Sequence, residues 1–122
     1  MKELLSRAGN MESLNAAINN GADAIYLGGK SFGARAYADN FSDEEMIEAI
    51  KYAHLYGVKI YVTMNTMITE ELIKPFINYV DFLHRNNVDA LIMQDIGMID
   101  YVRQVYPNLE VHASTQMHMH NL

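Results

Sequence analysis

The chain has 122 residues, half of them hydrophobic and a fifth charged, which is enough for one modest domain with a real core. It contains no cysteine, which excludes disulfides, thiolate nucleophiles and cysteine-ligated metal sites within these residues. The formal net charge of -6 argues against a general nucleic-acid-binding surface but is compatible with a local basic pocket. The apolar runs are too short to span a membrane and no leader peptide opens the chain, so we expect a cytoplasmic protein without a membrane partner.

Turn and capping signals divide the chain into alternating strands and helices. Apolar and β-branched runs predict five strands, at residues 3–5, 23–27, 58–64, 90–93 and 109–113. Helical spacing predicts four helices between them, at residues 11–20, 43–56, 69–85 and 96–106. Ser42 and Glu45 have the spacing of a capping box, whereas Pro75 lies too deep for a first turn and predicts a kink or a late start of the third helix.

The alternation of strands and helices indicates βαβ units and a parallel sheet. Asp23-Ala24 and Asp89-Ala90 recur at two helix-to-strand joints, each after an Asn-Asn pair. No linker rich in glycine, serine or proline divides the chain, so we expect one α/β domain, or one piece of one, over residues 1–122. We also expect a set of apolar strand residues to line the open interior of the sheet: Val58, Ile60, Val62, Leu91 and Met93.

The stretch from Gly21 to Ala36 contains the most elaborate strand exit. Two cations, Lys30 and Arg35, lie among its glycines Gly28, Gly29 and Gly33. Glycine N–H groups can approach a ligand closely, so this loop is a candidate site for a carboxylate or phosphate, with a plain turn as the alternative. The letters G-K-S within it resemble the end of a P-loop, but an alanine stands where the first glycine of that motif belongs, which disfavours nucleotide binding.

Polar side chains are also predicted where the other strands end. They are Asn65, Gln94, Asp95, Ser114 and Gln116, with His112 inside the last strand. The carboxyl ends of parallel strands meet at one edge, so we expect this group to line a substrate pocket, although turn formation explains each residue equally well by itself. Asp95 is the only carboxylate among them and is the candidate general base. The lack of a second such carboxylate argues against a paired-acid hydrolase.

Histidines are concentrated near the end of the chain. His118 and His120 would share one face of an extended segment, which is the arrangement of a metal pair. No aspartate, glutamate or cysteine follows Glu110, so the sequence offers few further ligands and we predict no metal site.

Seven motifs of the chain resemble peptidase family U32, the collagenase-like proteases. They are L-L-x-x-A-G-N at 4–10, G-A-D-A-I-Y-L-G-G-K at 21–30, F-G-A-R-A at 32–36, N-F-S-D-E-E at 40–45, G-V-K-I-Y-V-T at 57–63, D-A-L-I-M-Q-D at 89–95 and H-A-S-T-Q-M at 112–117. They run in order over essentially the whole chain. The chain departs from the family at Ser6-Arg7, where the family usually has Ala-Pro, which affects the exit of the first strand.

The resemblance implies the first half of a (β/α)8-type barrel and a peptidase activity with collagen as the type substrate. Other members of the family are implicated in hydroxylating RNA bases or a quinone precursor, and several hold an iron–sulfur cluster through cysteines. The resemblance therefore implies no cofactor within this chain, and an iron–sulfur cluster in a longer parent protein. The substrate that it implies is a peptide or an RNA.

The first hypothesis is that the chain is the N-terminal segment of a U32 peptidase-like enzyme, inactive alone, whose strand-exit loops form one wall of a substrate pocket. One alternative is part of a base- or ring-hydroxylating enzyme. Another is a non-catalytic truncated fragment that self-associates. A half-barrel leaves a sheet edge and a sheet face uncovered, so we expect either a homo-oligomer or a missing C-terminal half.

Overall fold

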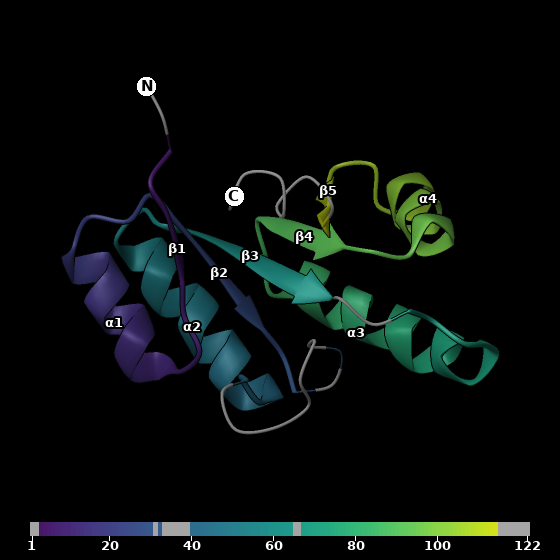
Figure 1. Ribbon diagram of the computed structural model, residues 1–122, viewed down its shortest axis with the longest axis horizontal. Helices are drawn as coiled ribbons and strands as arrows, with labels where there is room; N and C mark the ends of the chain where they lie inside the picture. The colour runs from purple at the N-terminus through teal and green to yellow at the C-terminus, as the bar shows by residue number, and fades with distance from the viewer. Residues whose placement is uncertain (1–2, 31, 33–39, 65–66, 115–122) are drawn as a thin grey trace.

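The structure is a computed structural model that describes residues 3–30, 32, 40–64 and 67–114. Its parallel sheet has the strand order β1-β2-β3-β4-β5 (Figure 1). The strands are β1 (Leu5–Arg7), β2 (Ala24–Gly28), β3 (Lys59–Met64), β4 (Ala90–Met93) and β5 (Glu110–Ala113). The helices are α1 (Met11–Asn19), α2 (Asp43–Leu55), α3 (Ile73–Arg85) and α4 (Ile96–Val105), with a short 3-10 helix η1 (Glu70–Leu72) before α3. The predicted α/β alternation is confirmed.

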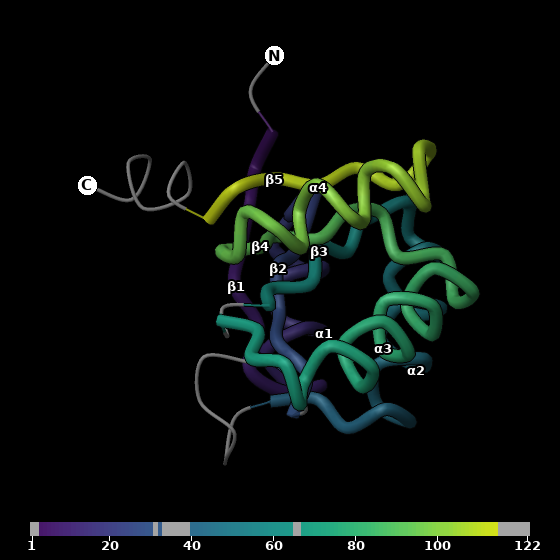
Figure 2. Tube along the Cα trace, turned by 90° about the vertical axis from the view of Figure 1, so that its right-hand side faces the viewer, coloured from purple at the N-terminus to yellow at the C-terminus, as the bar shows by residue number. Residues whose placement is uncertain are grey.

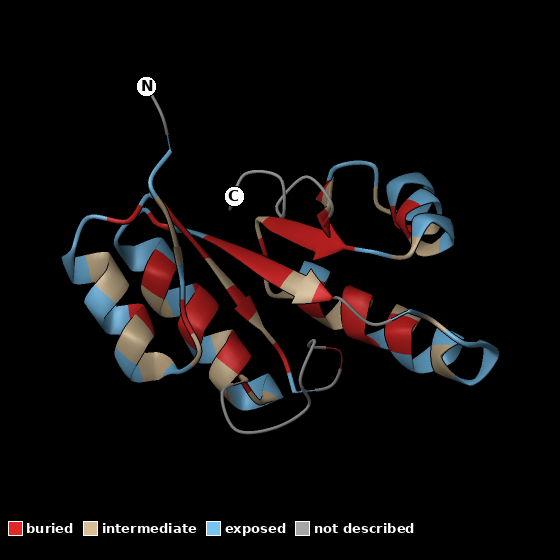
Figure 3. Ribbon diagram, viewed as in Figure 1, coloured by how far each residue is buried: buried red, intermediate tan, exposed pale blue. Residues whose placement is uncertain are grey.

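The helices cover one face of the sheet (Figures 1 and 2). The main core lies between that face and the helices, where strand residues such as Ile25 and Ile60 pack in one cluster with helix residues such as Leu14, Met46 and Phe76. Figure 3 shows the buried stripes of the helices beside the strands. This arrangement of consecutive parallel strands with an outer helical layer is that of a partial barrel.

The opposite face of the sheet carries a smaller cluster that contains strand residues only. We call it the helix-free face, and its members are Ala24, Tyr61, Ala90 and Ile92, with Leu5 and Tyr26 packed against them. The expectation that Val58, Ile60, Val62, Leu91 and Met93 line the open interior is wrong, because all five belong to the helix-covered core. Strand side chains alternate between faces, so the apolar residues of Lys59–Met64 face the helices and the alternate residues face the interior.

The helix starts follow the capping signals. Asn10 accepts from Ser13 N at 2.8 Å and starts α1, while Ser42 and Glu45 form the predicted capping box of α2. Of the predicted kink or late start of the third helix, the structure shows the late start: η1 precedes α3. Pro75 is the third residue of α3, where no intrahelical N–H bond is lost.

The two Asp-Ala joints make the same contact at the amino ends of the strands. Asp23 Oδ2 accepts from Leu4 N and Asp89 Oδ2 accepts from Ile60 N, each at 2.7 Å. Each aspartate also donates its own N–H to the carbonyl of that same residue. These pairs fix the register of neighbouring strands at their starts.

The first strand begins two residues later than predicted. Residues Leu5, Ser6 and Arg7 pair with Ala24, Ile25 and Tyr26, so the segment predicted as the strand exit is itself the strand. The cause is the contact of Asp23 with Leu4 N, which places residue 4 just before the ladder.

Within the part of the chain that the structure describes, no helix combines the length and apolar character needed to cross a bilayer.

Candidate functional site

The carboxyl ends of the strands lie along one edge of the sheet, because all five strands are parallel. The described candidates at this edge are Gly28, Gly29, Lys30, Gln94, Asp95 and Ser114, with His112 inside β5. Arg35, Asn65 and Gln116 were also predicted here, and His118 and His120 near the end of the chain, but these five lie outside the described residues.

Asp95 links two loops at this edge. Its Oδ1 accepts from Met98 N at 3.2 Å and caps α4, and its Oδ2 accepts from Ile68 N at 3.0 Å in the segment that leaves β3. Both carboxylate oxygens are therefore held by backbone amides. This arrangement fixes the two loops relative to each other, and it explains the residue without a catalytic role.

Gly28, the last residue of β2, and Gly29 directly after it serve strand pairing and close packing. Phe41 N donates to Gly28 O at 2.8 Å, and Lys30 N donates to Phe41 O at 2.9 Å, so one N–H group of the predicted anion loop is already bonded. A Cβ on Gly29 would lie 1.9 Å from the Tyr79 hydroxyl oxygen. Gly29 is therefore required by the side chain beneath it, and an anion site at this loop stays a prediction.

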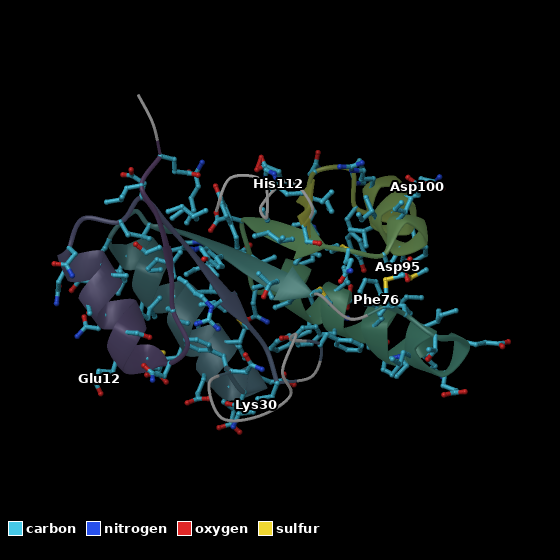
Figure 4. All side chains as sticks on the ribbon, in the orientation of Figure 1. Glu12, Lys30, Phe76, Asp95, Asp100 and His112 are labelled. Carbon is cyan, nitrogen blue, oxygen red and sulfur yellow. The ribbon has the colours of Figure 1, made fainter. Side chains whose placement is uncertain are left out.

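Lys30 is exposed, and its charge acts on the first turn of α2. The hydrogen bonds from Ser42 hold the pKa of Glu45 below its ordinary value, and the nearby Lys30 ammonium adds to this effect. Figure 4 shows Lys30, Asp95 and His112 at three separate places. The structure does not bring these three predicted residues together.

A polar cluster on the helix-free face was not predicted. The Tyr61 hydroxyl donates to Glu3, with both carboxylate oxygens at 3.0 Å, and the Tyr61 ring lies 5.8 Å from the His112 ring. His112 Nε2 donates to Glu110 Oε2 at 2.9 Å. Burial, followed by the contact with Glu3, raises the pKa of Tyr61 above its ordinary value. The sequence signal was the alternation of Lys59, Tyr61 and Thr63 with apolar residues.

The other predicted residues differ in exposure. Gln94 is exposed, whereas Ser114 is buried with 6% relative exposure. No group of three histidine, aspartate or glutamate side chains within the described ranges is arranged to hold a metal ion.

A hollow of about 460 Å³ opens between the start of α2 and the side of α3, and sequence reasoning missed it. We call it the aromatic hollow; its walls include Phe32, Tyr79 and Phe82, with Asp43 and Asn78 among them. Burial, and to a lesser degree the Asp43 carboxylate, raise the pKa of Tyr79. The sequence signal was the i,i+3 aromatic pair Tyr79 and Phe82, which shares one helix face.

The fold and the strand-exit edge define an α/β protein of the partial-barrel class. The sequence profile of peptidase family U32 matches residues 9–122, and the chain belongs to this family.

Three curated relatives indicate how varied the family is. The tRNA hydroxylation protein P1 of Bacillus subtilis is 44% identical over 98% of this chain and 28% of its own length. The 23S rRNA 5-hydroxycytidine C2501 synthase of Escherichia coli is 43% identical over 93% of this chain and 17% of its own length. The collagenase of Porphyromonas gingivalis is 34% identical over 98% of this chain and 28% of its own length. The chain thus spans less than a third of these relatives.

Solved structures agree on the fold. The U32 peptidase Mk0906 superposes with a TM-score of 0.74 at 14% identity, over 91% of this chain and 47% of that chain. The YdjI aldolase of Escherichia coli superposes with a TM-score of 0.56 at 16% identity, over 90% of this chain and 42% of that chain. These likenesses concern the fold alone.

Proposed function

We propose that this chain forms the first half of the catalytic barrel of an enzyme that hydroxylates bases in tRNA or rRNA, acting in the cytoplasm. The observation that carries the proposal is its similarity, at 44% and 43% identity, to a tRNA hydroxylation protein and to an rRNA 5-hydroxycytidine synthase. Further tRNA hydroxylation proteins, from Helicobacter pylori and Escherichia coli, are each 36% identical. The rest of the barrel would come from outside these residues.

In this proposal the described residues build one wall of the substrate pocket. Asp95 acts as a positioning residue, because its two oxygens hold the β3 exit segment against the start of α4. Lys30, Gln94, His112 and Ser114 stay candidates for substrate contacts. An iron–sulfur cluster would need cysteine ligands from outside this chain, because the chain has none, so no step of the reaction is assigned to one here.

Peptide-bond hydrolysis is the second candidate, supported by 34% identity to a collagenase and 42% identity to an uncharacterized protease of Methanocaldococcus jannaschii. It is less favoured because Asp95, the only carboxylate predicted at the strand exits, has both oxygens bonded to backbone amides. Those two bonds already account for Asp95 as a structural residue, and the predicted strand exits offer no second carboxylate for a paired-acid hydrolysis.

Complementation tests the proposal. The full reading frame that contains this chain would be expressed in Escherichia coli lacking its own tRNA hydroxylation protein or its rRNA 5-hydroxycytidine synthase, and digested tRNA and rRNA would be analysed by mass spectrometry. Return of a hydroxylated nucleoside in one of the two strains supports the proposal. Restoration in neither strain, together with gelatin cleavage by the purified protein, would replace it with the peptidase function.

A further inference from the structure

Arg7 is the last residue of β1, at the edge of the sheet where the strands end. Leu5 of the same strand packs on the helix-free face, and side chains two residues apart on a strand point to the same face, so Arg7 belongs to that face as well. Its partner in the ladder is Tyr26 of β2, which also packs on the helix-free face. An arginine and a tyrosine are therefore neighbours on the inner side of the partial barrel.

Neither polar group is used by the part of the protein that the structure describes. Arg7 is exposed and Tyr26 is half-buried, and neither side chain forms an ion pair or a hydrogen bond with another described residue. Glu3, a carboxylate just before β1, accepts instead from the Tyr61 hydroxyl. The N–H donors of the Arg7 guanidinium are therefore available for a ligand.

The other described lysines near this position lie differently. The Lys30 ammonium acts on Glu45 in the first turn of α2, which belongs to the helical layer. Lys59 alternates onto the helix-free face, but it is the first residue of β3 and lies at the amino ends of the strands. Arg7 combines both features of a substrate contact, because it stands at the carboxyl end of a strand and on the inner face. Barrels of this class hold their substrates at that end.

The chemistry of the inner face favours a phosphate beside Arg7. A complete barrel encloses this face, and a charge removed from water is costly unless an anion pairs with it. A guanidinium binds a phosphate through two parallel hydrogen bonds, and a tyrosine hydroxyl can donate a third. Tyr61 and His112 add two rings to the same face, 5.8 Å apart. A cation for the backbone beside rings on which bases can stack is the combination that binds single-stranded nucleic acid.

We propose that Arg7 binds a backbone phosphate of the RNA substrate on the helix-free face, with a further hydrogen bond from the Tyr26 hydroxyl to the same phosphate. The proposal rests on the RNA-directed function proposed above and adds to it the residue that holds the RNA backbone at the end of the first strand. A contact to phosphate contributes affinity and position but carries no preference for a particular base.

The salt dependence of RNA binding tests this assignment. The full-length protein encoded by the reading frame that contains this chain is titrated at several salt concentrations, and fluorescence anisotropy gives the affinity. The probes are labelled tRNA and labelled rRNA fragments from the two deletion strains of the complementation test. Loss of one phosphate contact reduces the slope of log affinity against log salt by about 0.7–0.9. Arg7→Gln should cause this reduction and weaken binding at low salt roughly tenfold.

Three further variants make the test specific. Arg7→Lys keeps the positive charge but not the paired hydrogen bonds, so it should retain the slope and lose part of the affinity. Tyr26→Phe removes one neutral donor and should weaken binding about 2- to 10-fold with the slope unchanged. Arg85→Gln is the matched control, because this guanidinium lies at the end of α3 and pairs with Asp81 at 2.6 Å; it should change neither quantity. Thermal unfolding of each variant shows whether the fold is retained.

An unchanged slope for a folded Arg7→Gln variant, or no RNA binding by the unmodified protein, would overturn the assignment. A lower melting temperature for Arg7→Gln with an unchanged slope would mean that Arg7 pairs with a carboxylate of the protein itself, which also overturns it. Complementation tests the reaction separately. Hydroxylation restored by the unmodified protein, with no effect of Arg7→Gln on the slope, would refute only the Arg7 contact. RNA binding that depends on Arg7, without hydroxylation in either strain, would refute only the proposed reaction.

Discussion

Replacing Asp95 by alanine should destabilise the chain through two separate losses. The cap of α4 disappears with the contact to Met98 N, which costs about 1 kcal/mol for a typical N-cap. The partly buried Ile68 N–H loses its acceptor, which costs about 1–3 kcal/mol. The sum of about 2–4 kcal/mol is a large share of the roughly 5–15 kcal/mol that stabilises a typical domain.

Asparagine at position 95 separates a positioning role from a purely catalytic one. Asparagine caps a helix about as well as aspartate, so the contact with Met98 N survives. Its NH2 group then faces the Ile68 N–H, donor against donor, so the free energy of unfolding should fall by about 1–3 kcal/mol. A residue that served only as a base would lose activity on this change without losing stability.

Urea unfolding followed by circular dichroism measures these differences. The matched control is Asp100→Ala, an exposed aspartate on the same helix (Figure 4), which should change the free energy of unfolding by less than about 0.5 kcal/mol. A free energy of unfolding for Asp95→Ala within that same margin of the unmodified chain would refute the two-loop contact.

Four other predictions concern single residues or the uncovered parts of the sheet. Gly29→Ala places a Cβ 1.9 Å from the Tyr79 hydroxyl oxygen, so this variant should lower the free energy of unfolding by about 1–3 kcal/mol. Unchanged unfolding in urea would contradict this, because it would mean that the loop moves away from Tyr79. Asn87 has a φ of 66°, which glycine adopts more readily, so Asn87→Gly should raise the melting temperature slightly. Asn86→Gly loses the hydrogen bond that the Asn86 side-chain amide donates to Phe82 O and should lower the melting temperature. Equal shifts for the two variants would contradict this prediction. Burial raises the pKa of Tyr79 above 10.0, so the folded state holds this proton at a pH where the unfolded chain releases it. Stability should therefore fall above about pH 10, by up to about 1.4 kcal/mol per pH unit for this group, and Tyr79→Phe should reduce that slope. Finally, the helix-free face and the sheet edges should pair with a second copy when the 122-residue chain is isolated, and a monodisperse monomer in light scattering at micromolar concentration would refute this.

Local signals in the sequence were sufficient for the order of the elements. Capping residues such as Ser42 act within one turn. The run Ala90–Met93 is recognisable as a strand because it is a short, continuous apolar run bounded by turn signals. The first strand was misplaced because its position depends on Asp23, the residue just before β2. Asp23 accepts the hydrogen bond from Leu4 N only in the folded chain.

The candidate site was harder to predict because sequence order gives the edge on which a residue lies but not its partners. Asp95 was recognised as a strand-exit carboxylate, but its contact with Ile68 joins residues from different loops. The interior was assigned to the wrong residues because an apolar strand residue can face either the helices or the barrel centre. The alternation of residues around Tyr61 shows which residues share a face of the sheet. Once the helices are known to lie on the other face, it identifies Tyr61 as an interior residue.

Mass spectrometry of nucleosides from its own host tests most directly whether this chain belongs to an enzyme that modifies RNA, as proposed above. The gene that encodes the chain is deleted, total tRNA and rRNA are purified separately and digested, and the hydroxylated nucleosides are quantified against a strain in which the gene is restored. We predict that one hydroxylated nucleoside disappears from one RNA fraction and returns with the gene. Identical hydroxylated nucleosides in the deleted and restored strains, in both fractions, would contradict it.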